Sequence, residues 1–74
     1  MDKNYDMIFG QNIRRLRMNI GMTQEQLAIK LQLAGCDITR SALAKIEAGQ
    51  RHIYPDEIKK LQKIMNIDYS DIFI

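Results

Sequence analysis

The chain has 74 residues, of which 46% are hydrophobic and 27% are charged, and it contains one cysteine and one histidine. This length suits a single small domain, and one cysteine with one histidine excludes both an intramolecular disulfide and a structural zinc site. The net charge of +2 is too small to indicate a nucleic-acid partner by itself. Any evidence for such a partner has to come from where the charged residues lie in the sequence.

Targeting segments and catalytic motifs are missing from the sequence. No apolar run approaches the roughly 18 residues of a membrane span, and the start, MDKNYDMIFGQ, lacks the apolar stretch of a signal peptide. There is also no glycine-rich phosphate loop, no paired His and Cys motif and no cluster of metal ligands. We therefore expect a cytoplasmic protein that is not an enzyme and uses no cofactor, metal, small-molecule ligand or membrane.

The first predicted helix begins near Asn4 or Asp6 and ends before Gly21. Apolar residues recur along it at the spacing of one helical face, namely Phe9, Ile13, Leu16 and Ile20. This face is expected to pack into the core.

The second helix has the clearest start in the chain. Thr23 and Gln26 have the spacing of a capping box, in which each side chain bonds the backbone of the other residue. The buried stripe is expected to contain Leu27, Ala28 and Leu31. Residues 33–37 break this periodicity and include Gly35, so they are predicted to form a connection.

The third helix is predicted to open at Thr39 and to stop at Gly49. Leu43 and Ile46 are three residues apart and therefore point to the same, inner side. The residues left on the outside are polar or basic: Arg40, Ser41 and Lys45.

A polar loop, Gln50-Arg51-His52, separates this helix from a fourth one with Pro55 in its first turn. The inner face of the fourth helix consists of Ile58, Leu61, Ile64 and Met65. Asp68 is positioned to cap a last short helix from Tyr69 to Ile74. The sequence thus predicts one all-α domain of five helices over residues 1–74.

Two short helices joined by a connection, the second with polar and basic residues outward, form the pattern that major-groove readers require. The segments Thr23-Gln24-Glu25-Gln26-Leu27-Ala28 and Thr39-Arg40-Ser41-Ala42-Leu43-Ala44-Lys45-Ile46-Glu47-Ala48-Gly49 resemble the Xre/Cro family of phage-repressor-like helix-turn-helix regulators. The resemblance extends from about Ile13 to Phe73. It implies a phage-repressor-like fold in which residues about 23–49 form the helix-turn-helix unit.

One segment departs from the family pattern. The stretch from Leu31 to Thr39 is about five residues longer than the compact turn of the best-known members. We expect Leu33, Cys36 and Ile38 to pack beneath this longer turn. Cys36 is interpreted as a small buried hydrophobe in preference to a redox sensor.

The resemblance implies roles for individual residues. Gln24, at the start of the second helix, would bind a phosphate, helped by exposed backbone N–H groups. Arg40 would be the leading base reader, because a guanidinium can donate two hydrogen bonds to a guanine edge. Further base or phosphate contacts are assigned to Thr39, Ser41, Lys45, Gln50 and Arg51. For Arg14, Arg15 and His52 we favour a solvated surface over a DNA contact.

The implied function is sequence-specific binding of double-stranded DNA at the nucleoid. The chain would regulate transcription, with repression as the expected mode, by reading a palindromic operator with the helix that starts near Thr39. The rival hypothesis is a protein-interaction module of the same fold, of the antitoxin or anti-repressor type. Such a module has no need for Arg40, Lys45 and Arg51 on one exposed side.

Two further predictions concern the architecture of the protein. Arg17 and Glu47 resemble family positions that form a partly buried ion pair between the first and third helices. The chain end is unusually apolar and favours a homodimer; its apolar residues are Ile67, Tyr69, Ile72, Phe73 and Ile74. The alternative is that these residues only close the core of the monomer, because a small domain needs that apolar area for itself.

Overall fold

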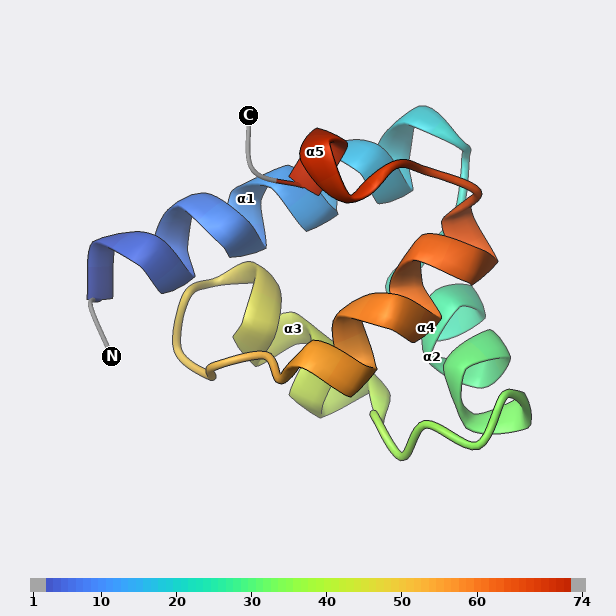
Figure 1. Ribbon diagram of the computed structural model, residues 1–74. Helices are drawn as coiled ribbons and strands as arrows, with labels where there is room; N and C mark the ends of the chain where they lie inside the picture. The colour runs from blue at the N-terminus through green and yellow to red at the C-terminus, as the bar shows by residue number, and fades with distance from the viewer. Residues whose placement is uncertain (1–2, 73–74) are drawn as a thin grey trace.

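The structure, a computed structural model, describes residues 3–72 of the chain. Within them lie five helices and no strand: α1 (Lys3–Asn19), α2 (Gln24–Leu33), α3 (Arg40–Glu47), α4 (Pro55–Met65) and α5 (Tyr69–Ile72). α1 packs against α3 and α5, and α2 packs against α3 and α4, as Figure 1 shows. The predicted all-α fold of five helices is confirmed.

The inner face of α1 agrees with the predicted pattern except at its end. Phe9 and Ile13 are buried, and Leu16 is half-buried against the core. Ile20 was expected on the same face, but it is 43% exposed. The helix ends at Asn19 and Gly21 has a φ of +73°, so Ile20 no longer follows the helical period and faces solvent.

α1 and α3 approach each other closely at Gly10. A Cβ atom on Gly10 would overlap the carbonyl oxygen of Ile46 and lie 2.9 Å from that of Glu47. Only glycine fits at position 10, because any larger residue would push the two helices apart.

Side-chain caps start α2 and α3 at the residues that the sequence predicted. Thr23 Oγ1 accepts a hydrogen bond from the Gln26 N–H at 3.0 Å, and Gln26 Oε1 accepts one from the Thr23 N–H at 2.9 Å. Thr39 Oγ1 accepts a hydrogen bond from the Ala42 N–H at 3.1 Å. These bonds satisfy backbone donors that the first helical turn leaves without partners.

The long connection between α2 and α3 is anchored by Cys36 and Ile38, which are buried as predicted. Burial raises the pKa of the Cys36 thiol, helped by the nearby carboxyl groups of α4. The expectation for Leu33 is wrong, because this residue is 83% exposed. Leu33 lies two residues after Leu31, which is about 200° around a helix, so the two side chains face opposite ways.

The last two helices close the core. On α4, Ile58, Leu61 and Met65 are buried and Ile64 is half-buried, in agreement with the predicted inner face. On α5, Ile72 is fully buried, and its carbonyl oxygen accepts a hydrogen bond of 2.7 Å from Asn12 Nδ2 of α1. No helix within residues 3–72 is both long enough and apolar enough to cross a membrane.

The apolar residues near the chain end therefore differ in burial. Ile72 belongs to the monomer core and Ile67 is half-buried against it, whereas Tyr69 is 53% exposed. Phe73 and Ile74, which the sequence assigned to the last helix and to a dimer contact, lie outside the described residues.

Candidate nucleic-acid interface

α3 has a buried side and an exposed side. Leu43 and Ile46 are buried in the core, whereas Arg40, Ser41 and Lys45 are exposed, as the sequence predicted. Thr39 is exposed as well, but its hydroxyl is engaged in capping the helix. The exposed polar and basic side chains thus begin at Thr39 and continue along α3.

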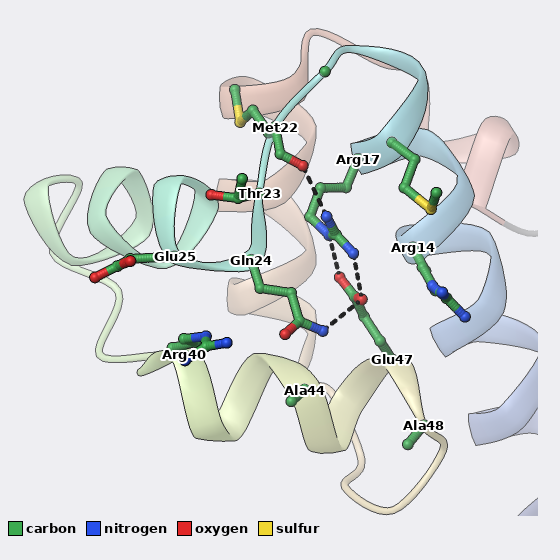
Figure 2. Close-up of a pocket in the computed structure, with 12 residues that line it drawn as sticks. Arg14, Arg17, Met22, Thr23, Gln24, Glu25, Arg40, Ala44, Glu47 and Ala48 are labelled. Carbon is green, nitrogen blue, oxygen red and sulfur yellow. Dashed lines mark hydrogen bonds and ion pairs between the residues drawn. The ribbon is translucent and has the colours of Figure 1, made fainter.

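A groove of about 870 Å³ runs between the end of α1, the start of α2 and α3. Figure 2 shows Arg14 on the α1 side, Gln24 at the start of α2, and Arg40, Ala44 and Ala48 along α3. Arg40 and Ala44 of α3 and its C-cap residue Ala48 are four positions apart and so form one row, in which the two alanines leave the groove open beyond Arg40.

The inner wall of this groove is a buried ion pair. Arg17 Nε and Nη2 donate to Glu47 Oε2 and Oε1 at 2.7 and 3.0 Å, and both side chains are almost fully buried. The hydrogen bonds to Glu47 raise the pKa of the Arg17 guanidinium, against the opposite effect of burial. The predicted pair between α1 and α3 is confirmed.

The same pair also holds the start of α2. Arg17 Nη1 donates to the carbonyl oxygen of Met22 at 2.7 Å, just before the capping residue Thr23. Gln24 Nε2 donates to Glu47 Oε1 at 3.1 Å, so the first side chain of α2 is linked to the last residue of α3. Sequence reasoning missed this contact, because no local pattern relates residues 23 positions apart and the resemblance implied only a phosphate contact for Gln24.

The two other arginines of the groove are not engaged in the same way. Arg14 and Arg40 are both exposed, and within residues 3–72 neither side chain forms a hydrogen bond or an ion pair. Arg14 lies three positions before Arg17, which places the two on neighbouring parts of α1. That spacing was the available sequence signal for a residue that we had assigned to the solvated surface.

Arg51 lies away from the groove, in the connection between α3 and α4. Its Nη1 and Nη2 donate to both carboxylate oxygens of Glu57 at 3.1 and 3.0 Å, and Nη1 also donates to the His52 carbonyl oxygen. Burial alone acts to raise the pKa of Glu57, but hydrogen bonds from Arg51 and from the Tyr54 N–H outweigh it, so that pKa is lowered.

The rest of this connection contains Gln50 and His52. Gln50 is exposed, and His52 Nδ1 lies 3.1 Å from Asp6 Oδ1 of α1. The structure thus brings Gln24 and Arg40 into one groove. Ser41 and Lys45 lie on the neighbouring exposed side of α3, and Gln50 and Arg51 lie in the connection that follows this helix.

Comparison with known proteins gives consistent results. Residues 13–72 match the family model described as helix-turn-helix. Control protein C.BamHI of Bacillus amyloliquefaciens is 33% identical over 73 residues, which cover 97% of this chain and 84% of that protein. The crystal structure of the restriction-modification controller protein C.AhdI from Aeromonas hydrophila matches with a TM-score of 0.83 and 32% identity, covering 96% of each chain. Every residue that lines the groove falls within the range 13–72.

Proposed function

Because this chain belongs to the helix-turn-helix family and is a DNA-binding transcription regulator, we propose that it recognises one duplex sequence by placing α3 in the major groove. The wide major groove admits an α-helix, and each base pair displays there its own pattern of donors and acceptors. Residues about 23–49, which include α2 and α3, would be the reading unit.

The observation that carries this proposal is the state of Arg40. It is the first residue of α3, its side chain is exposed, and no other group within residues 3–72 binds its guanidinium. An unengaged guanidinium at the start of a recognition helix suits a guanine edge, which offers two acceptors. Ser41 and Lys45 are exposed on the adjoining row and are proposed to contact bases or phosphates.

Phosphate contacts are proposed around this reading helix. Gln24 lies at the start of α2, where backbone N–H groups and the helix dipole favour an anion, and Arg14 faces it across the groove. Thr39, Gln50 and Arg51 are further candidates. Arg51 would have to share its guanidinium between a phosphate and Glu57.

The names of the relatives support a more specific role. One is called a control protein and the other a restriction-modification controller. We therefore assign this chain to control of the genes of a restriction-modification system, with repression as the mode. The proposed form is a homodimer on a palindromic operator, because one short helix reads too few bases alone.

Selection of binding sites from random duplex DNA tests the function directly. The purified chain should enrich a palindromic sequence, and Arg40→Ala should lose preference at one base position in each half-site. If the folded chain enriches no sequence, the proposed function fails and an interaction module of the same fold becomes the better hypothesis.

A further inference from the structure

The amide of Gln24 has its orientation determined by Glu47. Two hydrogen bonds from Arg17 anchor the Glu47 carboxylate, which has only acceptor atoms to offer. The group of Gln24 that faces Glu47 must therefore be the NH₂ group, and it donates to Glu47 Oε1 at 3.1 Å. The opposite arrangement would bring two acceptor oxygens together and is unfavourable.

This contact leaves a defined set of groups for the groove. One N–H of the Gln24 amide is used by Glu47, so one N–H and the amide oxygen remain. Figure 2 shows the amide oxygen turned away from Glu47, toward the part of the groove between Arg40 and Ala44. A glutamine on a helix surface otherwise loses rotamer freedom when it binds, and a side chain that is already held avoids that cost.

We infer that Glu47 is a positioning residue for DNA binding. It touches no DNA itself, but it holds the Gln24 side chain so that the remaining N–H can donate to a backbone phosphate while the oxygen stays on the side of Arg40. This inference rests on the proposed function. It gives Glu47 a second role besides the ion pair, because the same carboxylate joins α1, α3 and the first residue of α2.

A double-mutant cycle on the selected duplex tests the inference. Gln24→Ala should weaken binding about tenfold, as expected for the loss of one hydrogen bond to a charged group, and Glu47→Asp, whose shorter side chain withdraws the acceptor from Gln24, should weaken it by a similar factor. The variant with both changes should bind no more weakly than either single variant. Effects of the two changes that add in binding free energy would overturn the inference, and so would an unchanged affinity in either single variant.

Arg17→Lys is the matched control. It removes the two-pronged contact with Glu47 and weakens the fold, but it leaves the carboxylate facing Gln24. Gln24→Ala should therefore still weaken binding about tenfold in this background, whereas in the Glu47→Asp background it should have little effect. Equal behaviour of the two backgrounds would show that loss of stability alone explains the result, and the inference would be wrong.

The measurements are made well below the melting temperature of each variant. If Glu47→Asp does not fold, the combined change Arg17→Met with Glu47→Met replaces it in the cycle, since it leaves no buried charge unpaired and offers Gln24 no acceptor. Additive effects in a chain that still selects its duplex reject only the role of Glu47. Failure of the unmodified chain to select any duplex rejects both this inference and the proposed function.

Discussion

At the scale of single residues, two arginine–glutamate pairs with similar geometry have different surroundings. The side chains of Arg17 and Glu47 are 9% and 3% exposed, whereas those of Arg51 and Glu57 are 29% and 12% exposed. A buried charge that loses its partner is costly, while a pair with partial access to water contributes less. The first pair is therefore expected to support the fold, and the second remains available for exchange with another anion.

Glu47→Ala should strongly destabilise the domain. It leaves the Arg17 guanidinium buried without a carboxylate, at a cost of about 3–5 kcal/mol, which is comparable with the whole stability of a domain this small. Thermal unfolding followed by circular dichroism should show a melting temperature lower by at least about 10 °C. Asp37→Ala, in the exposed connection, is the control and should change it little. An unchanged melting temperature for Glu47→Ala would contradict the role of the pair.

Arg40 and Arg51 should behave differently in DNA binding. Arg40→Ala is expected to cost about 1–3 kcal/mol on the preferred duplex and to relax preference at one base position. Arg51→Ala should weaken all duplexes about equally and lower the slope of log K against log salt by about 1. Binding isotherms at several salt concentrations measure both effects, with Lys63→Ala on α4 as control. Uniform weakening by Arg40→Ala would transfer base reading to Ser41 and Lys45.

The Arg51–Glu57 pair should also make stability depend on pH. The pKa of Glu57 lies below its ordinary value of 4.5, so its contribution to stability is present above that pH. That contribution is lost as the pH falls through the lowered pKa, because the carboxyl must then be protonated. Melting temperatures from about pH 7 to about pH 3 should therefore fall less in Glu57→Gln than in the unmodified chain. Identical pH profiles would show that the pair does not contribute.

At the scale of helices, the contact between α1 and α3 depends on Gly10. Alanine in place of a helical glycine normally stabilises by about 0.5–1 kcal/mol. Here the added Cβ would meet the backbone oxygens of Ile46 and Glu47, which cannot rotate away. The steric effect should prevail, and Gly10→Ala should lower the free energy of unfolding by about 1–3 kcal/mol.

Urea denaturation of Gly10→Ala and of Gln11→Ala distinguishes these two effects. Gln11 is the next residue of α1 and is exposed, so its replacement should leave the free energy of unfolding nearly unchanged. A gain in stability for Gly10→Ala would mean that α1 and α3 can separate freely, in conflict with the close approach seen here.

At the scale of the whole molecule, the proposed dimer should form through the surface near the chain end. Ile72 is unavailable because it is buried in the monomer, but Tyr69 on α5 is exposed. Tyr69→Asp should weaken self-association and reduce affinity for a palindrome with half-sites about 10 base pairs apart. Sedimentation equilibrium with and without the duplex measures both.

Leu33→Asp is the matched control for this prediction. Leu33 is an exposed apolar residue on α2, so its replacement changes hydrophobicity and charge in the same way on another helix. It should leave the association constant unchanged. A chain that remains monomeric and binds a single half-site at full affinity would contradict the dimer.

Sequence alone determined the features that depend on neighbours along the chain. The cap of α2 by Thr23 and the start of α3 at Thr39 are set by side chains that bond a backbone N–H three residues away. The buried stripes on α2 and α4 follow from the 3.6-residue period of a helix. These local rules were enough to predict five helices and the exposed side chains of Arg40, Ser41 and Lys45 on α3, whereas the fold family was implied by the resemblance. The predictions for Ile20 and Leu33 were wrong for different reasons: Ile20 lies beyond the end of α1, where the helical period no longer applies, whereas Leu33 follows the period of α2, which turns it away from Leu31.

Only the tertiary structure decided how distant residues meet. The bond from Gln24 to Glu47, the pairing of Arg51 with Glu57 and the position of Arg14 beside the groove all depend on where separate elements pack. No periodicity encodes such contacts, because side-chain partners are chosen by the relative placement of elements and by the need to satisfy buried charge. Composition and spacing could not predict the Arg17–Glu47 pair for this reason. The resemblance could, because it carries over how the helices of the family are placed.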